Sequence, residues 1–250
     1  MIAITIEYPF LFFKRKLLVK APTSWDELTE RQFIAISRTI NGAEPDFRFL
    51  SLLTGISQNL LKKLHPFHLL KLSEGIEFVV KAGNFHSSFI IREIPGTGFV
   101  CPKPKLSNMT FGQFIFVDSH YSEWKTTKNE KSLNSLVASL YFLPGEKFDN
   151  ETIADRVCMI ENTGIDIRKA IAFNYSLIMM WLVGCYPLIF QTSGEHVGEN
   201  CIRPKQSGWL KLFESLVGED LINRDRYAEI PINTVLRYLT TKYKENARKG

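Results

Sequence analysis

The sequence predicts a predominantly helical α+β fold, a single compact domain with a small N-terminal β element and a helical C-terminal region. Residues 2–8 alternate apolar and polar side chains, which is the period of a half-buried strand. From Ser24 onward the apolar side chains recur at helical spacing instead. The chain has 250 residues, 45% hydrophobic and 23% charged, ordinary values for a globular domain that exclude the disordered and collagen-like classes.

We expect three parts within this one domain. They are an N-terminal β element at 1–23, a helical core at 24–190 with one inserted strand near 85–94, and a loop with a C-terminal helical region at 191–250. The β element contains strands near 2–8 and 15–20. The inserted strand ends at the Pro95-Gly96 turn, because this pair of residues is typical of turns.

Capping signals and apolar periodicity predict the helices. The clearest example is 132–143, in which Leu133, Leu136 and Leu140 fall on one face. Capping boxes begin at Thr29 and Thr110, where a threonine precedes a glutamine by three residues. The expected helices cover 29–40, 46–54, 57–64, 66–79, 110–121, 132–143, 151–159, 166–184, 209–217 and 231–244.

The segment Leu177–Phe190 is the most apolar stretch of the sequence. Its 14 uncharged residues are fewer than the roughly 20 that cross a bilayer, and Gly184 and Pro187 interrupt it. We therefore expect no membrane partner. This segment is predicted to be a buried helix, either in the core of the subunit or at a contact between subunits.

The sequence assigns no catalytic, cofactor-binding or metal-ligating residue, and it predicts a protein that is not an enzyme and needs no cofactor. His65 and His68 lie three residues apart, but a metal site would need further ligands, so they are predicted to cap and pack a helix. Asp118, Ser119 and His120 are the residue types of a catalytic triad. As neighbours on one helix they point in different directions, which argues against that role.

The four cysteines, Cys101, Cys158, Cys185 and Cys201, form no CxxC pair. This spacing matches neither a disulfide framework nor a zinc module. We expect buried or half-buried free thiols in a reducing compartment.

The net charge of +5 is small for a dedicated nucleic-acid binder. The basic residues are dispersed in the sequence rather than gathered in one stripe; the groups are Lys14–Lys16, Lys62-Lys63, Lys103 with Lys105, and Lys242, Lys244, Arg248 and Lys249. A few lysines directed at DNA suffice for electrostatic attraction, so non-specific contact with double-stranded DNA stays open.

Several segments resemble structural proteins from the virion gene blocks of tailed bacteriophages. The resemblance begins with SWDELT at 24–29 and LLTGIS at 52–57. It continues with LSNMTFGQFIF at 106–116 and ASLYFLP at 138–144, and extends through about residue 190. Phages that infect Bacteroides and its relatives, including crAss-like phages, carry proteins of this appearance.

This resemblance implies a virion protein made in the bacterial host cytoplasm, a ring protein of the neck between portal and tail. Its implied partners are identical subunits in the ring, the portal, other neck or tail proteins and packaged double-stranded DNA. Three alternatives remain: a tail assembly chaperone, a DNA-packaging or head-completion adaptor and, in a different class, an enzyme with an unrecognised pocket.

A closed ring needs two different surface patches on each subunit. The sequence offers the apolar helix at 177–190, the Phe-rich segment at 10–13 and exposed tryptophans at Trp25, Trp124 and Trp209. The alternative is that these side chains belong to the core of the subunit itself, since buried apolar helices are common in larger domains.

Overall fold

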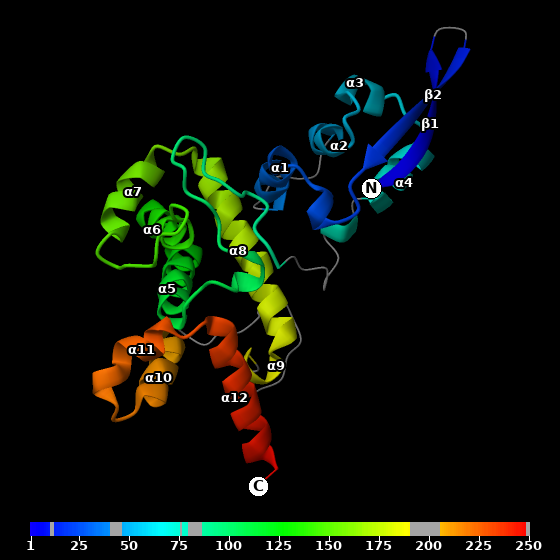
Figure 1. Ribbon diagram of the computed structural model, residues 1–250. Helices are drawn as coiled ribbons and strands as arrows, with labels where there is room; N and C mark the ends of the chain where they lie inside the picture. Colours follow the sequence, from blue (N-terminus) through cyan, green and yellow to red (C-terminus); the bar gives the residue numbers. More distant parts are fainter. Residues whose placement is uncertain (11–12, 41–46, 76, 80–86, 191–205, 249–250) are drawn as a thin grey trace. The chain divides into compact units, whose positions relative to one another are not determined.

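The computed structural model describes residues 1–250 except 11–12, 41–46, 76, 80–86, 191–205 and 249–250 (Figure 1). The chain is mostly helical with a small two-stranded N-terminal sheet, which confirms the predicted α+β class. It divides into two compact units, Met1–His86 and Ser87–Gly250, called unit 1 and unit 2 below. The division between these units does not coincide with the boundaries expected after residues 23 and 190.

The sheet of unit 1 is an antiparallel hairpin of β1 (Ile2–Phe10) and β2 (Phe13–Ala21). Ile4 lies opposite Val19, and both are buried, whereas Glu7 and Lys16 pair on the solvent face. The predicted alternation is therefore confirmed for residues 3–8, whose side chains the structure describes. The side chains of 10–13, one of the expected contact patches, lie outside the described residues.

Short helices complete unit 1. They are η1 (Trp25–Glu27), α1 (Glu30–Ile40), α2 (Phe47–Thr54), α3 (Gln58–Leu61), α4 (Pro66–Gly75) and η2 (Glu77–Val79). The capping box at Thr29 is present: its N–H donates to Gln32 Oε1 at 2.9 Å, and the Gln32 N–H donates to Thr29 Oγ1 at 3.3 Å. The core beneath the hairpin comprises Ile4, Ile6, Val19, Ile56, Leu61, Leu64 and Leu72.

Unit 2 is built around the contacts of α6 with α5, α7 and α8. Its helices are η3 (Pro104–Leu106), α5 (Phe111–Thr127), α6 (Glu130–Leu140), α7 (Ile153–Glu161), α8 (Ile165–Cys185), α9 (Pro187–Phe190), α10 (Gln206–Val217), η4 (Leu221–Asn223), α11 (Arg224–Glu229) and α12 (Ile232–Ala247). The predicted start of α5 is confirmed, because Thr110 Oγ1 accepts the N–H of Gln113 at 3.2 Å. Helix α6 is buried along nearly its whole length, as its strong apolar periodicity predicts.

The inserted strand expected at 85–94 is wrong for the described residues 87–94. There only Glu93 makes a bridge, to Val100. Side chains take the place of a strand partner: the Asn174 amide bonds the backbone of Ser88 and Ile90, and the Tyr141 hydroxyl donates to the Ile91 carbonyl at 2.6 Å. The segment is apolar and extended because it packs against helices, not because it joins a sheet.

The apolar helix expected at 177–190 forms the second half of α8 together with α9. Leu177, Ile178 and Leu182 are buried within the subunit, which confirms the core interpretation for one face of the helix. Gly184 and Cys185, at the end of α8, are exposed. None of the helices in the described ranges combines the length and hydrophobicity of a membrane span.

Candidate functional site

His65 immediately precedes α4, and His68 lies in its first turn. His65 Nδ1 accepts the N–H of Phe67 at 3.3 Å, so the predicted capping role of His65 is confirmed. His68 packs edge-on against the Phe67 ring, with 5.8 Å between ring centroids. Within the described residues, no group of three His, Cys, Asp or Glu side chains comes together that could hold a metal ion.

The three triad-type residues of α5 do not converge. The Asp118 carboxylate is buried and accepts the Tyr175 hydroxyl of α8 at 3.2 Å. His120 packs against Phe116, 4.6 Å between centroids, and its Nδ1 lies 3.8 Å from the Glu123 carboxylate. Burial lowers the pKa of His120 below its ordinary value, and Glu123 opposes this shift to a smaller extent. The arrangement supports packing of α5 rather than proton transfer between these groups.

Among the three cysteines that the structure describes, the expectation of buried or half-buried thiols is correct for one. Cys101 is half-buried, but Cys158 of α7 and Cys185 at the end of α8 are exposed. Cys201 lies outside the described residues. Both exposed cysteines fall on the outward faces of their helices, which the sequence pattern did not distinguish.

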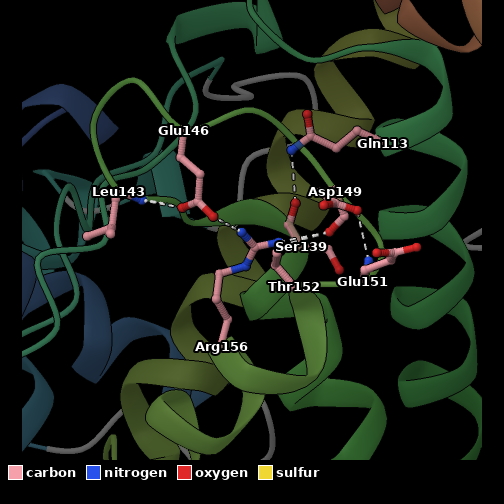
Figure 2. A network of polar contacts seen from close by, with 8 residues as sticks. All are labelled: Gln113, Ser139, Leu143, Glu146, Asp149, Glu151, Thr152 and Arg156. Atoms are coloured by element: carbon pink, nitrogen blue, oxygen red, sulfur yellow. Dashed lines mark hydrogen bonds and ion pairs between the residues drawn. The ribbon is translucent and has the colours of Figure 1, made fainter.

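A polar network around Arg156 joins α7 to the loop that follows α6 (Figure 2). The Arg156 guanidinium is buried, forms an ion pair with Glu146 and donates to the Asp149 carbonyl at 3.3 Å. Its Cζ also lies 4.4 Å from the centroid of the Phe142 ring. Glu146 in turn accepts the N–H of Leu143 at 3.0 Å. Arg156 thus holds the loop at Asp149 directly and near Leu143 through Glu146.

A second buried guanidinium, that of Arg168, ties α8 to α6. Its Nε donates to the Thr163 carbonyl at 3.1 Å and its Nη1 donates to the Asn134 side chain. Glu130 Oε2 lies 3.6 Å from the same Nη1. Charged groups that are already paired inside a helical bundle stabilise one packing arrangement, and we assign both arginines this structural role.

The three tryptophans expected on the surface are buried, so this part of the surface prediction is wrong. Trp25 lies edge-on to Phe33 and Phe78, with centroids 6.1 Å and 5.3 Å away. Trp209 of α10 makes similar contacts with Phe111, Phe114 and Phe190. Trp124 packs against Tyr121. These three tryptophans therefore belong to the cores of the two units.

The apolar surface lies elsewhere, on smaller side chains. Leu221 and Ile222 of η4 are 69% and 97% exposed, next to each other in one turn of unit 2. In unit 1, Phe67 and Leu70 of α4 are each more than half exposed, and their spacing of three residues puts them on one helix face. Sequence periodicity missed both pairs, although Leu221-Ile222 stands between Asp220 and Asn223, an apolar pair in a polar setting.

No protein-family model, no curated protein and no solved structure matches this chain.

Proposed function

We propose that the chain is a non-enzymatic structural subunit of a tailed-bacteriophage virion, located in a ring of the portal–tail connector. It acts through contacts with identical subunits and with the portal and tail proteins around the DNA channel. The resemblance of residues 24–57, 106–116 and 138–144 to phage virion proteins supports the class. The exposed apolar side chains support the mode of action.

The pair Leu221-Ile222 is the observation that carries the proposal. An aliphatic side chain that is 97% exposed contributes nothing to the packing of its own subunit. Full burial of a leucine or isoleucine contributes about 1.5–3 kcal/mol. Burial of both side chains by a neighbouring subunit therefore stabilises the contact between the subunits by several kilocalories per mole.

A ring also needs a second surface of different shape, because head-to-tail contacts join unlike patches. Phe67 and Leu70 of α4 supply a candidate for it. Lys71 lies over the Phe67 ring, 4.6 Å from its centroid, and gives this patch a polar edge. In this proposal the η4 pair of one subunit packs on the α4 pair of the next.

Substitution of the exposed pair tests the proposal. We expect L221Q/I222Q to raise the concentration at which the chain assembles by at least about tenfold, since about 1.4 kcal/mol per subunit contact suffices for that factor. The matched control is L143Q/M159Q, which replaces two other partly exposed apolar side chains of unit 2. Static light scattering measures both.

The result also separates the alternatives. Assembly that is lost equally in both variants contradicts a specific η4 contact. A chain that never self-associates but binds a tail protein one-to-one favours the tail assembly chaperone instead.

A further inference from the structure

Helix α12, drawn in red in Figure 1, carries a basic stripe on its outer face. Val235, Leu236 and Leu239 are buried and mark its inner face. At about 100° per residue, Arg237, Lys244 and Arg248 lie within about 40° of one another on the opposite face. Every residue from 241 to 248 is exposed. The cations that look dispersed in the sequence are thus aligned by the helix.

The start of α12 is fixed to the rest of unit 2 by backbone hydrogen bonds. The Ile232 N–H donates to the Met109 carbonyl at 3.0 Å, and the Phe111 N–H donates to the Ile230 carbonyl at 2.8 Å. Buried side chains hold the first half of the helix, so its basic second half extends from a rigid base.

A fourth cation, Lys105, belongs to the same face. Asn233 precedes Arg237 by one helical turn, and its Nδ2 donates to the Lys105 carbonyl at 2.9 Å. Lys105 has φ 61°, a left-handed conformation that non-glycine residues rarely adopt. Its own N–H donates to the Ser87 carbonyl at 2.7 Å, so both of its backbone polar groups are held. These bonds keep the exposed Lys105 beside the first turn of α12.

We propose that Lys105, Arg237, Lys244 and Arg248 bind the phosphate backbone of double-stranded DNA without sequence specificity. The inference rests on the proposed position at a DNA channel and names the surface that faces the DNA. Consecutive helical cations are separated by seven and four residues, or about 10 Å and 6 Å along the axis. A duplex offers phosphates every few ångströms, so a row of cations of this length can contact several of them.

The charges beside the stripe favour an anion as its occupant. Glu245 lies off the stripe and is 3.4 Å from Lys242 Nζ, so a lysine outside the stripe already pairs with it. The exposed large apolar side chains of α12, Tyr238 and Tyr243, lie about 100° or more around the helix from the middle of the stripe, so the stripe itself carries none. A helix that binds a membrane surface inserts apolar side chains, which this face lacks. Phosphates of a nucleic acid therefore suit the stripe better than a lipid bilayer does.

The test measures binding of the full chain to a fluorescein-labelled DNA duplex of about 30 base pairs by fluorescence anisotropy, across a series of salt concentrations. We expect R237Q/K244Q/R248Q to bind at least about tenfold more weakly at low salt and to reduce the slope of log K against log salt by about 2.7, or about 0.9 for each lost phosphate contact. The matched control K125Q/K131Q/K211Q removes the same charge from exposed positions on α5, α6 and α10. It is expected to keep the wild-type slope to within about one contact. Circular dichroism verifies that each variant is folded.

Equal losses in the two variants, or no loss in the stripe variant, overturn the inference. It is overturned as well if the stripe is needed for binding to phosphatidylserine vesicles and not for binding to DNA. The readouts separate the two proposals. If the chain stays monomeric and its DNA binding depends on the stripe, the ring proposal is contradicted and the DNA-binding inference is not. If the chain forms a ring and its DNA binding does not depend on the stripe, the inference is contradicted and the ring proposal is not.

Discussion

The side-chain amide of Asn174 pairs with the backbone around Ile90 as a neighbouring strand would. Asn174 Oδ1 accepts the Ile90 N–H at 2.7 Å, and Asn174 Nδ2 donates to the Ser88 carbonyl at 2.9 Å. Asn174 is fully buried on α8, between Ile171 and Ile178 on the same helix face. One polar side chain in an apolar helix thus fixes the first residues of unit 2.

Replacement of Asn174 by leucine is expected to lower the free energy of unfolding by about 2–6 kcal/mol. The change leaves a backbone N–H and a backbone carbonyl without their partner, at about 1–3 kcal/mol each. Urea denaturation measures the loss. The exposed Asn162 bonds the Cys158 carbonyl at 3.3 Å, and N162A serves as the control with a change below about 0.5 kcal/mol. Similar losses for N174L and N162A would show that the amide of Asn174 is not a strand substitute.

The Arg156 network predicts a local effect on the loop after α6. We expect R156M to lower the free energy of unfolding by about 1–3 kcal/mol, because the ion pair with Glu146 is lost. The loss stays in this range because Glu146 is partly exposed and its carboxylate becomes hydrated when its partner is removed. Limited proteolysis is expected to cut the 143–152 loop faster in R156M than in the wild type. R226M, a change of an exposed arginine, is the control. Unchanged cleavage of the loop in R156M would contradict the role of Arg156 as its fastener.

His120 makes stability depend on pH. Burial lowers the pKa of the folded-state imidazole below its ordinary value of 6.5, so the unfolded chain binds more protons near that pH. The free energy of unfolding therefore rises as the pH increases through this window, and the contribution is lost as the pH falls. In H120Q this contribution is absent. Urea denaturation at a series of pH values measures the free energy of unfolding of both proteins. The value for the wild type minus the value for H120Q is expected to increase with pH, and a difference that decreases with pH would contradict the role of His120.

The exposed thiols predict a labelling pattern. Cys158 and Cys185 are expected to react rapidly with a thiol reagent in the folded protein, and Cys101 more slowly, since access controls the rate. Each of the variants C158S and C185S is expected to remove one rapidly reacting thiol per chain. Absorbance of the released reagent gives the count. A fast phase that neither variant changes would contradict the outward orientation of these helix faces.

Local patterns in the sequence predicted most of the elements. Helix caps and apolar spacing depend on residues that are close together in the sequence, so they can be recognised before the fold is known. Examples are the caps at Thr29 and Thr110 and the spacing of Leu133, Leu136 and Leu140. The strand predicted at 85–94 is wrong because an alternating pattern indicates which side chains are buried, but not which groups form hydrogen bonds with the backbone. Its partners, Asn174 and Tyr141, lie far away in the sequence.

Surface features were harder to predict than elements. Trp25 and Trp209 are expected outside, yet their partners Phe78, Phe111 and Phe190 come from other helices and cover them. The basic stripe was hidden for a different reason: Arg237 stands apart from the cluster at the end of the sequence, and only the helical period aligns it with Lys244 and Arg248. Two sequence signals indicate features that periodicity does not predict. An asparagine in an apolar helix indicates a buried hydrogen bond to the backbone, and an apolar pair between polar residues indicates an exposed apolar surface.

The mass of the purified chain in solution tests the central claim most directly. Multi-angle light scattering is expected to give an integral multiple of the 28.7 kDa subunit mass that stays constant across micromolar concentrations, as a closed ring requires. A single species of 28.7 kDa over the same range, unchanged when the portal protein is added, would contradict the account.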